Sequence, residues 1–435
     1  MFRFVFSCIR KGFNQSNTSL DTSEWPEGFC SPSVCKEIIF ALTETQLSMD
    51  TCPIMEFVQK YSSQFQHVEI ECIHSTEKRL IKRWCVHFNV FLQILTSNSQ
   101  LISVKFLYLS NCFQHIDTPT YVDICRTISL FLESQHRLKR VEFRICSFRF
   151  DEGVELLGKL TENSRESLTH LVLVLFVRYE PMDKVILSAY DSLSIIPSTA
   201  AQTLPLLIDF PGLRTLEIDY SFILENMVAL QSIAIQTVKN SGTLVLSNIF
   251  IHYDNRRTPI EVFQGLTSTD WRFLKILCPD LQVELVIYTN LPSRRELEFF
   301  IVPNMPITRL TYLCDNSNME MDIVVLFGHL LACKTNDHLV SLSVGWEMPI
   351  PDLVHAFPPF LKACRILKCL ELYLAHPANG IHLLMQSWLE NRPESLEKVR
   401  INITEIEEED EYANLMSLAS ELKLRGLNVN VNLYF

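Results

Sequence analysis

One stretch near the C-terminus, residues 367–376, most constrains how this chain can fold. It reads Leu-Lys-Cys-Leu-Glu-Leu-Tyr-Leu-Ala-His, so its leucines follow the spacing L-x-x-L-x-L and then continue at every second residue. Alternate residues of a β-strand point to opposite faces, which places the last three leucines on one face and Glu371 and Tyr373 on the other. A lone strand cannot bury its apolar face. The stretch therefore predicts neighbouring strands that stack beside it.

The same strand pattern returns about a dozen times along the chain, mostly at intervals of roughly 30 residues. Between most of these strands lies a segment with apolar residues at helical spacing, such as residues 78–96 and residues 121–134. Strands that alternate with helices at this interval are typical of the longer class of leucine-rich repeat.

A doubly wound α/β fold also alternates strands and helices, but its strands are covered on both faces and read as continuous apolar runs. Here polar residues alternate with apolar ones, as at Arg140, Glu142 and Arg144, and again at Glu217 and Asp219. One face of the sheet is therefore expected to meet solvent. We predict an α/β leucine-rich-repeat solenoid, with a curved parallel sheet on its concave side and helices on its convex side.

The repeats depart from the strict pattern at the end of each strand. A regular leucine-rich repeat places Asn or Cys eight residues after its first leucine, where the side chain satisfies backbone groups of the loop. Cys146 occupies this place after Leu138, whereas Ser221, Asp315 and Thr404 occupy it in other repeats. We therefore expect irregular repeats.

Two other segments follow the pattern loosely. The strand expected around Leu244 and Leu246 is weakly defined. Residues 259–277 read as one helix with a break near Ser268, because apolar residues recur there at helical spacing.

The chain divides at about residue 60. Residues 1–60 read as an N-terminal lead-in, because residues 14–32 are rich in Ser, Thr, Asn and Pro and have few apolar residues. Within the lead-in, residues 34–42 fit either a short strand or a short helix. Residues 61–435 form the repeat region, with an insertion around residues 178–210 that prolines punctuate. Such an insertion is expected to form a loop on one rim of a repeat protein.

Composition and charge exclude several classes of function. A formal net charge of -12 argues against a general nucleic-acid binder, which neutralises phosphates with Lys and Arg. No segment is long and uncharged enough to span a bilayer, and the apolar residues 1–10 are few and are interrupted by Arg3. The 14 cysteines are scattered without a C-x-x-C pair, which favours free buried thiols in a reducing compartment. We expect neither nucleic acid nor membrane as a partner, and a location in the cytoplasm or nucleus.

Signals of catalysis are nearly absent. The chain has no Gly-rich phosphate loop, no H-E-x-x-H and no G-x-S-x-G. Its 12 histidines do not cluster, and His67 and His170 fall on outward strand positions, where a contact residue is more common than a ligand. We therefore expect a protein that is not an enzyme, with no cofactor and no metal site.

Candidate binding residues are the charged and aromatic side chains that strand alternation turns toward the concave face. Such side chains supply specificity at protein interfaces. For each of them the alternative, that it merely solvates the sheet, stays open. The predicted partner-binding residues are Lys105, Arg140, Glu142, Arg144, Glu217, Asp219, Glu371, Tyr373, Lys398 and Arg400.

Several segments of residues 61–435 resemble the leucine-rich-repeat part of F-box proteins. The matching segments are residues 65–71, the helix at 79–95 with the strand at 101–106, residues 129–134 with 137–143, and the closing strand at 428–435. The resemblance implies a substrate-recognition subunit of an SCF-type E3 ubiquitin ligase. In such a subunit the F-box binds Skp1, which connects to the cullin, and the repeats hold a protein target.

The lead-in departs from this family. An F-box is a helical module that opens with a Leu-Pro pair, and that pattern is not readable before Trp25. Residues 25–40 resemble at most its tail. We expect either a truncated form, in which Skp1 and cullin bind only once an F-box is restored, or a protein that has lost its coupling to the ligase. The alternative function is a leucine-rich-repeat scaffold that binds a protein target on the same face.

Overall fold

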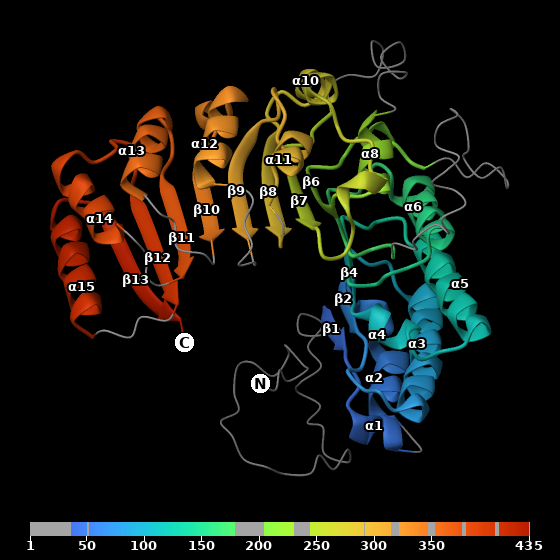
Figure 1. Cartoon of the computed structure of the whole chain (residues 1–435). Coiled ribbons are helices and arrows are strands. Elements are labelled where there is room, and N and C mark those ends of the chain that lie inside the picture. The colour runs from blue at the N-terminus through green and yellow to red at the C-terminus, as the bar shows by residue number, and fades with distance from the viewer. Residues whose placement is uncertain are drawn as a thin grey trace. The chain divides into compact units, whose positions relative to one another are not determined.

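The structure is a computed structural model. It describes residues 36–49, 52–178, 204–229, 244–290, 292–314, 322–346, 353–375, 380–404 and 409–434 (Figure 1). The chain divides into two compact units, Met1–Glu217 and Ile218–Phe435. Among the described residues, thirteen strands follow one another in chain order, β1 to β13. The prediction of an α/β leucine-rich-repeat solenoid is confirmed, because strands pair in parallel with their sequence neighbours and helices connect most of them.

The first unit builds its repeats from a strand and the helix or helices that follow it. Parallel pairing runs from β1 through β5, and the helices lie on one face of these strands (Figure 1). Its strands are β1 (Glu37–Phe40), β2 (His67–Glu71), β3 (Ser103–Leu107), β4 (Arg140–Arg144), β5 (His170–Val174) and β6 (Thr215–Asp219), whose last two residues belong to the second unit. Its α-helices are α1 (Glu44–Ser48), α2 (Pro53–Tyr61), α3 (Lys78–Asn98), α4 (Leu109–Phe113), α5 (Thr118–Ser134) and α6 (Phe150–Ser164).

The second unit repeats the same plan. Parallel pairing runs from β7 through β13, again with helices on one face. Its further strands are β7 (Asn248–Asp254), β8 (Gln282–Thr289), β9 (Ile307–Cys314), β10 (Ser341–Trp346), β11 (Cys369–Ala375), β12 (Lys398–Thr404) and β13 (Asn428–Tyr434). Its α-helices are α8 (Phe222–Ala229), α10 (Ser268–Leu277), α11 (Arg294–Phe300), α12 (Ile323–Ala332), α13 (Leu353–Ala363), α14 (Ile381–Glu390) and α15 (Glu409–Leu424). We call the helix-free face of each unit its open face.

Side-chain alternation separates the core from the open face. In β11 the leucines at 370, 372 and 374 are buried, whereas Glu371 is half-buried and Tyr373 is exposed. On the helical side, α3 buries Leu80, Trp84 and Phe88, which recur every four residues. Each fully buried large apolar side chain contributes about 1.5–3 kcal/mol of transfer free energy. Burial of one strand face and one helix stripe therefore accounts for the layered repeat.

The turns after β3, β4 and β5 contain residues in the left-handed backbone region. Tyr108, Ile145 and Leu175 each follow their strand directly, with φ of 61°, 58° and 49°. The backbone N–H of Tyr108 donates to the carbonyl of Arg144 at 2.9 Å, and that of Ile145 donates to residue 174 at 2.7 Å. These bonds continue the inter-strand ladder and offset the roughly 1–2 kcal/mol that a left-handed non-glycine residue costs.

Cys146 has the role expected of the Asn or Cys position. It is buried, and its thiol donates to the backbone carbonyl of Phe106 at 3.5 Å. In the neighbouring turns, backbone N–H groups donate to backbone carbonyls instead, as Ser110 does to Ile145 and Ser147 to Leu175. The expected irregularity of the repeats is therefore seen at their turns.

For residues 259–277, the predicted break near Ser268 is confirmed, but the helix predicted before that break is wrong. The structure has one 3-10 turn at Ile260–Val262 and begins α10 only at Ser268. Thr267 and Asp270 form a capping box, in which each side chain accepts the other's backbone N–H. Gly265 has φ of 85°, which a helix cannot contain. The weakly defined strand near residue 244 begins four residues later, as β7.

The structure resolves one alternative in the lead-in. Residues 37–40 form a strand, β1, which pairs with β2, so the sheet begins within the predicted lead-in. Residues 1–35, which would hold most of an F-box remnant, lie outside the described residues. Most of the insertion predicted around 178–210 also lies outside them; its end contains a 3-10 turn at Leu207–Asp209.

Candidate partner-binding face

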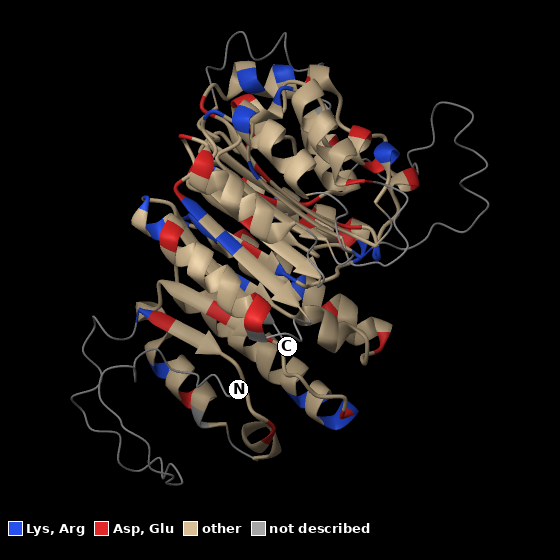
Figure 2. Cartoon of the chain, turned by 60° about the vertical axis from the view of Figure 1, so that its left-hand side comes forward, with Lys and Arg blue, Asp and Glu red and all other residues tan. Residues whose placement is uncertain are grey.

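The open face of the first unit carries charges of alternating sign on neighbouring strands. Glu69, Lys105 and Glu142 occupy matching register positions of β2, β3 and β4. Lys105 Nζ lies 3.3 Å from a carboxylate oxygen of Glu69 and 3.8 Å from one of Glu142. Opposite charges on facing strand positions attract. Charged residues of both signs lie on the strands as well as on the helices (Figure 2).

Glu142 is the centre of this arrangement. Arg140 Nε donates to its Oε1 at 2.6 Å, and Arg144 Nε donates to its Oε2 at 2.9 Å. The Glu142 side chain is only 4% exposed, whereas those of Lys105, Arg140 and Arg144 are 35%, 44% and 34% exposed. The expectation that Glu142 can contact a partner is therefore wrong. It points to the open face as predicted, but three cations cover it.

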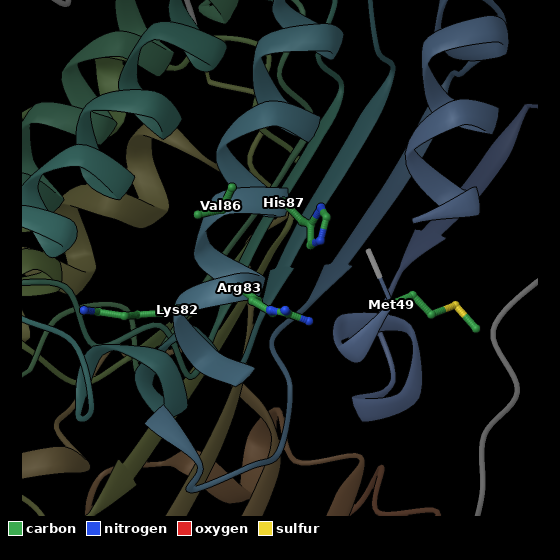
Figure 3. A pocket seen from close by; sticks show the side chains of 5 residues that line it. All are labelled: Met49, Lys82, Arg83, Val86 and His87. Carbon is green, nitrogen blue, oxygen red and sulfur yellow. The ribbon is translucent and has the colours of Figure 1, made fainter. Parts of the chain in front are cut away.

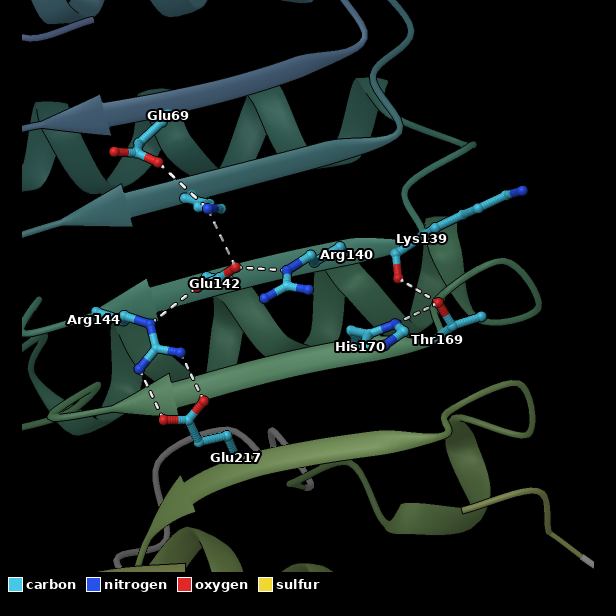
Figure 4. A network of polar contacts seen from close by, with 9 residues as sticks. Glu69, Lys139, Arg140, Glu142, Arg144, Thr169, His170 and Glu217 are labelled. Carbon is cyan, nitrogen blue, oxygen red and sulfur yellow. Dashed lines mark hydrogen bonds and ion pairs between the residues drawn. The ribbon is translucent and has the colours of Figure 1, made fainter. Parts of the chain in front are cut away.

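Arg144 reaches over one whole strand to a second carboxylate. Its Nη1 and Nη2 donate to the two carboxylate oxygens of Glu217 on β6, at 2.8 and 2.7 Å (Figure 4). The intervening strand β5 presents Val172 and Val174 on this face, which leaves room for the guanidinium. Val172 is buried on the open face because this ion pair crosses the strand that carries it. We call the following six residues the charge network: Glu69, Lys105, Arg140, Glu142, Arg144 and Glu217.

The charge states of the charge network follow from its hydrogen bonds. Burial alone would raise the pKa of the Glu142 carboxyl, but hydrogen bonds from Arg144 and Arg140 and the charge of Lys105 outweigh it and lower the pKa. The hydrogen bonds to Glu217 raise the pKa of Arg144. A nearly buried carboxylate is stable only while its cations stay in place.

The open face of the second unit holds a smaller cluster around Glu371. Its Oε1 accepts from Arg400 Nη1 at 2.8 Å, from Tyr373 Oη at 3.0 Å and from Asn402 Nδ2 at 3.4 Å. Arg400 lies opposite Glu371 in the β11–β12 register. Asn402 is buried and accepts from Asn432 Nδ2 at 2.9 Å, so uncharged amides continue the cluster onto β13.

The structure gathers eight of the ten predicted residues into these two clusters. Asp219, half-buried at the end of β6, and Lys398, exposed at the start of β12, belong to neither. The residues gathered in the first unit are Lys105, Arg140, Glu142, Arg144 and Glu217, and those gathered in the second are Glu371, Tyr373 and Arg400.

Three residues of the clusters were not among the predicted ones. The alternation that selects Lys105 also selects Glu69, so the sequence holds that signal. Asn402 and Asn432 carry no charge. Asn402 alternates with Lys398 and Arg400 on β12, and the signal for Asn432 is the Asn at every second position of β13. An amide that pairs with the same residue type on the next strand forms a ladder.

Two buried carboxylates lie away from the open face. Glu225 on α8 accepts the backbone N–H groups of Gly265 at 2.6 Å and Gln264 at 3.2 Å, and thereby holds the loop before α10. Burial raises the pKa of Glu225, and it raises the pKa of Glu296 on α11 to about 7. Both side chains are part of the packed helical side of the second unit.

The helical side of the first unit has a shallow depression of about 290 Å³ between α1 and α3 (Figure 3). Two of its three basic groups are engaged or less readily charged: Arg83 Nη1 donates to a carbonyl of α1 at 2.6 Å, and burial, followed by the charge of Arg83, lowers the pKa of His87. The third, Lys82, is exposed. Its lining has no carboxylate to act as an acid or base. The residues that line it are Met49, Lys82, Arg83, Val86 and His87.

Within the described ranges, no group of His, Cys, Asp or Glu is arranged to hold a metal ion. The helices that the structure describes are each too short or too polar to cross a membrane.

Comparisons with known proteins add little to this geometry. No protein-family model matches the chain, and no curated protein matches it. Among solved structures, the crystal structure of a TLR13–ssRNA13 complex is similar over 87% of this chain, with 11% identity and a TM-score of 0.32. This chain spans 48% of the length of that one. The fold assignment therefore rests on the strand order and pairing described above.

Proposed function

We propose that this chain is a protein-interaction module that holds a protein partner on its open face. The observation that carries the proposal is the charge network, which holds Lys105, Arg140 and Arg144 in place while leaving about a third or more of each side chain exposed. Side chains that are already ordered lose little conformational entropy when a partner binds. Arginine is also enriched among residues that dominate interface energies.

The test is capture of a partner by the purified full chain, followed by comparison of two charge reversals in the first unit. Lys105→Glu changes the open face, and Lys82→Glu changes an exposed lysine of α3 on the helical side. We expect Lys105→Glu to reduce capture of the same partner several-fold and Lys82→Glu to leave it unchanged. Thermal unfolding checks that both variants are folded, and Lys105→Gln serves where the reversal destabilises the unit. Equal capture by all variants would overturn the proposal.

We propose further that partner binding serves an SCF-type E3 ubiquitin ligase. The resemblance of residues 61–435 to F-box proteins supports this finer role. The chain would then act in the cytoplasm or nucleus as a substrate adaptor without catalytic activity of its own. Skp1 would bind an F-box present or restored in the lead-in, the cullin would join through Skp1, and partner subunits would transfer ubiquitin. The alternative is an interaction scaffold that binds the same partner without Skp1.

Co-precipitation with Skp1 and cullin separates these two roles. For an adaptor, the chain with an F-box restored to its lead-in should retain Skp1 with or without the Lys105→Glu change, because this variant lies outside the lead-in, while only the form with Lys105 retains the target. Capture of the target without Skp1 even when the F-box is restored would favour the scaffold.

A further inference from the structure

Basic side chains converge where β4 and β5 begin on the open face of the first unit. Arg140 and His170 are register partners on these neighbouring strands and lie side by side (Figure 4). Arg214, which directly precedes β6, is exposed, and its backbone N–H donates to the carbonyl of Thr169 at 2.9 Å. The charges of Arg140 and Arg214 both act on His170. Three basic groups thus share one end of the open face.

Arg140 is the arginine of the charge network whose two terminal nitrogens, Nη1 and Nη2, remain able to donate together to one ligand. Its Nε is bonded to Glu142, but Nη1 and Nη2 have no hydrogen-bond partner in the part of the chain that the structure describes. Arg144, in contrast, uses Nε, Nη1 and Nη2 on Glu142 and Glu217. The bond to Glu142 holds the Arg140 guanidinium in one orientation and leaves its outer edge unused. This edge matches the two oxygens of a carboxylate.

The hydroxyl of Thr169 lies between a backbone carbonyl and the ring of His170. Thr169 Oγ1 is 2.9 Å from the carbonyl oxygen of Lys139, to which it can donate, and 2.9 Å from His170 Nδ1. When the hydroxyl donates to that carbonyl, Nδ1 carries the ring proton, and Nε2 is the atom that gains one when the ring becomes charged. Nε2 has no hydrogen-bond partner among the described residues. Protonation thus adds an N–H donor beside the free edge of Arg140.

We propose that Arg140 and His170, with Arg214 beside them, bind a carboxylate side chain of an acidic segment of the partner protein. This inference rests on the proposed function and names the chemistry that the open face recognises. Glu142, the carboxylate bonded to this group, accepts Arg140 Nε and Arg144 Nε and so leaves the outer edge of Arg140 unoccupied. The free edge of Arg140 offers one bidentate contact, which suits a single carboxylate better than the row of phosphates that a nucleic acid presents.

The site should bind more tightly at lower pH. Burial, then the charges of Arg140 and Arg214, lower the pKa of His170, and Glu142 opposes them in part. The ring is therefore neutral near pH 7 and gains its proton on acidification, which a bound carboxylate favours. Binding should therefore strengthen as the pH falls below about 6.5, the ordinary pKa of histidine, and the series should stop above about 4.3, the ordinary pKa of the ligand's own glutamate groups.

The test is binding of a fluorescein-labelled oligoglutamate peptide to the full chain, followed by fluorescence anisotropy. Arg140→Gln should weaken binding about fivefold, the effect of one half-exposed ion pair. Arg140→Lys should recover part of the loss, since Lys keeps the charge without the fork. His170→Gln should remove the gain in affinity at low pH. Arg126→Gln, at an exposed arginine of α5, is the matched control and should bind as the wild type does.

Unchanged affinity of folded Arg140→Gln for the peptide would overturn the carboxylate site. So would tighter, Arg140-dependent binding of a single-stranded oligonucleotide of equal charge. Partner capture distinguishes this failure from failure of the proposed function. If Lys105→Glu abolishes capture while Arg140→Gln changes neither capture nor peptide binding, only the carboxylate site is wrong. If capture is insensitive to every open-face variant, the proposed function fails as well.

Discussion

The open faces of the two units are built from the same alternating strands but hold their charges differently. In the first unit, Glu142 is almost fully covered and is neutralised by three cations, one of which bridges to Glu217 across a whole strand. In the second unit, the Glu371 side chain is 26% exposed and is held by one arginine and by uncharged Tyr and Asn side chains. A carboxylate that loses most of its water needs several charged donors, whereas a solvated one does not.

This difference shows that a position on the open face does not decide how a residue is used. Glu142 and Glu371 follow the same in-and-out rule, yet the first supports its neighbours and the second is accessible. The exposed atoms available to a partner in the first unit are the outer edges of cations, above all Arg140. In the second unit they include Tyr373, Lys398 and Arg400, whose side chain is 42% exposed.

The largest expected effect tests the assignment of faces on which the comparison depends. Leu372 is fully buried beside Glu371 in β11. Leu372→Asp should lower the free energy of unfolding by about 3–5 kcal/mol, because it places a charge in an apolar core. Glu371→Lys should cost less than about 1 kcal/mol. Urea unfolding measures both, and equal losses would refute the assignment.

Removal of the two central carboxylates tests the comparison itself. Glu142→Gln should lower the free energy of unfolding by about 2 kcal/mol, because Arg140 and Arg144 lose a charged partner in a water-poor site. Glu371→Gln should cost less than about 1 kcal/mol, since water can solvate Arg400. Denaturant titration measures the free energy of unfolding of both variants. An equal loss in the two would contradict the comparison.

Lowering the pH should reduce the difference in stability between the wild type and Glu142→Gln. The pKa of Glu142 is lowered in the folded chain, so its stabilising contribution is fully present above the unfolded-state value of about 4.3. The contribution is lost as the pH falls through the lower folded-state pKa. Melting temperatures of both proteins between neutral pH and about pH 3 should therefore converge. A constant gap would show that the carboxylate is not charge-stabilised.

The smallest expected effect concerns the arginines that meet each carboxylate. Arg144→Lys should lower the free energy of unfolding by about 1 kcal/mol, because lysine cannot make the bidentate contact with Glu217 across β5. Arg400→Lys should cost less than about 0.5 kcal/mol, as Arg400 donates a single bond to Glu371 at 2.8 Å. Thermal unfolding of the two variants measures both losses. A larger loss for Arg400→Lys would reverse the expected order.

The sequence predicted the strands and the side to which their residues point. Period-two alternation assigned Leu372 to the core and Glu371 to the open face, as the structure has them. It also selected Arg140, Glu142 and Arg144 as one group on β4. The part of the 259–277 helix before its predicted break near Ser268 was misread, because apolar periodicity outweighed the capping signal of Thr267 and Asp270, which begins the helix only at Ser268.

The sequence could not predict which side chains of distant strands pair, or that this pairing covers the Glu142 carboxylate. Arg144 and Glu217 are 73 residues apart, and they meet only because the intervening strand presents Val172 and Val174. Nothing in the alternation of β4 shows that Glu142 loses its water. Coverage of a charge depends on the lengths of neighbouring side chains in three dimensions, which a single strand pattern does not contain.

Lysine labelling of the chain bound to its captured partner tests the central claim most directly. Lys105 lies on the open face and Lys82 on the helical side of the same unit. Acetylation rates of both, read by mass spectrometry with and without partner, should show protection of Lys105 and an unchanged rate at Lys82. Protection of Lys82 with an unchanged rate at Lys105 would show that the partner binds the helices and not the open face.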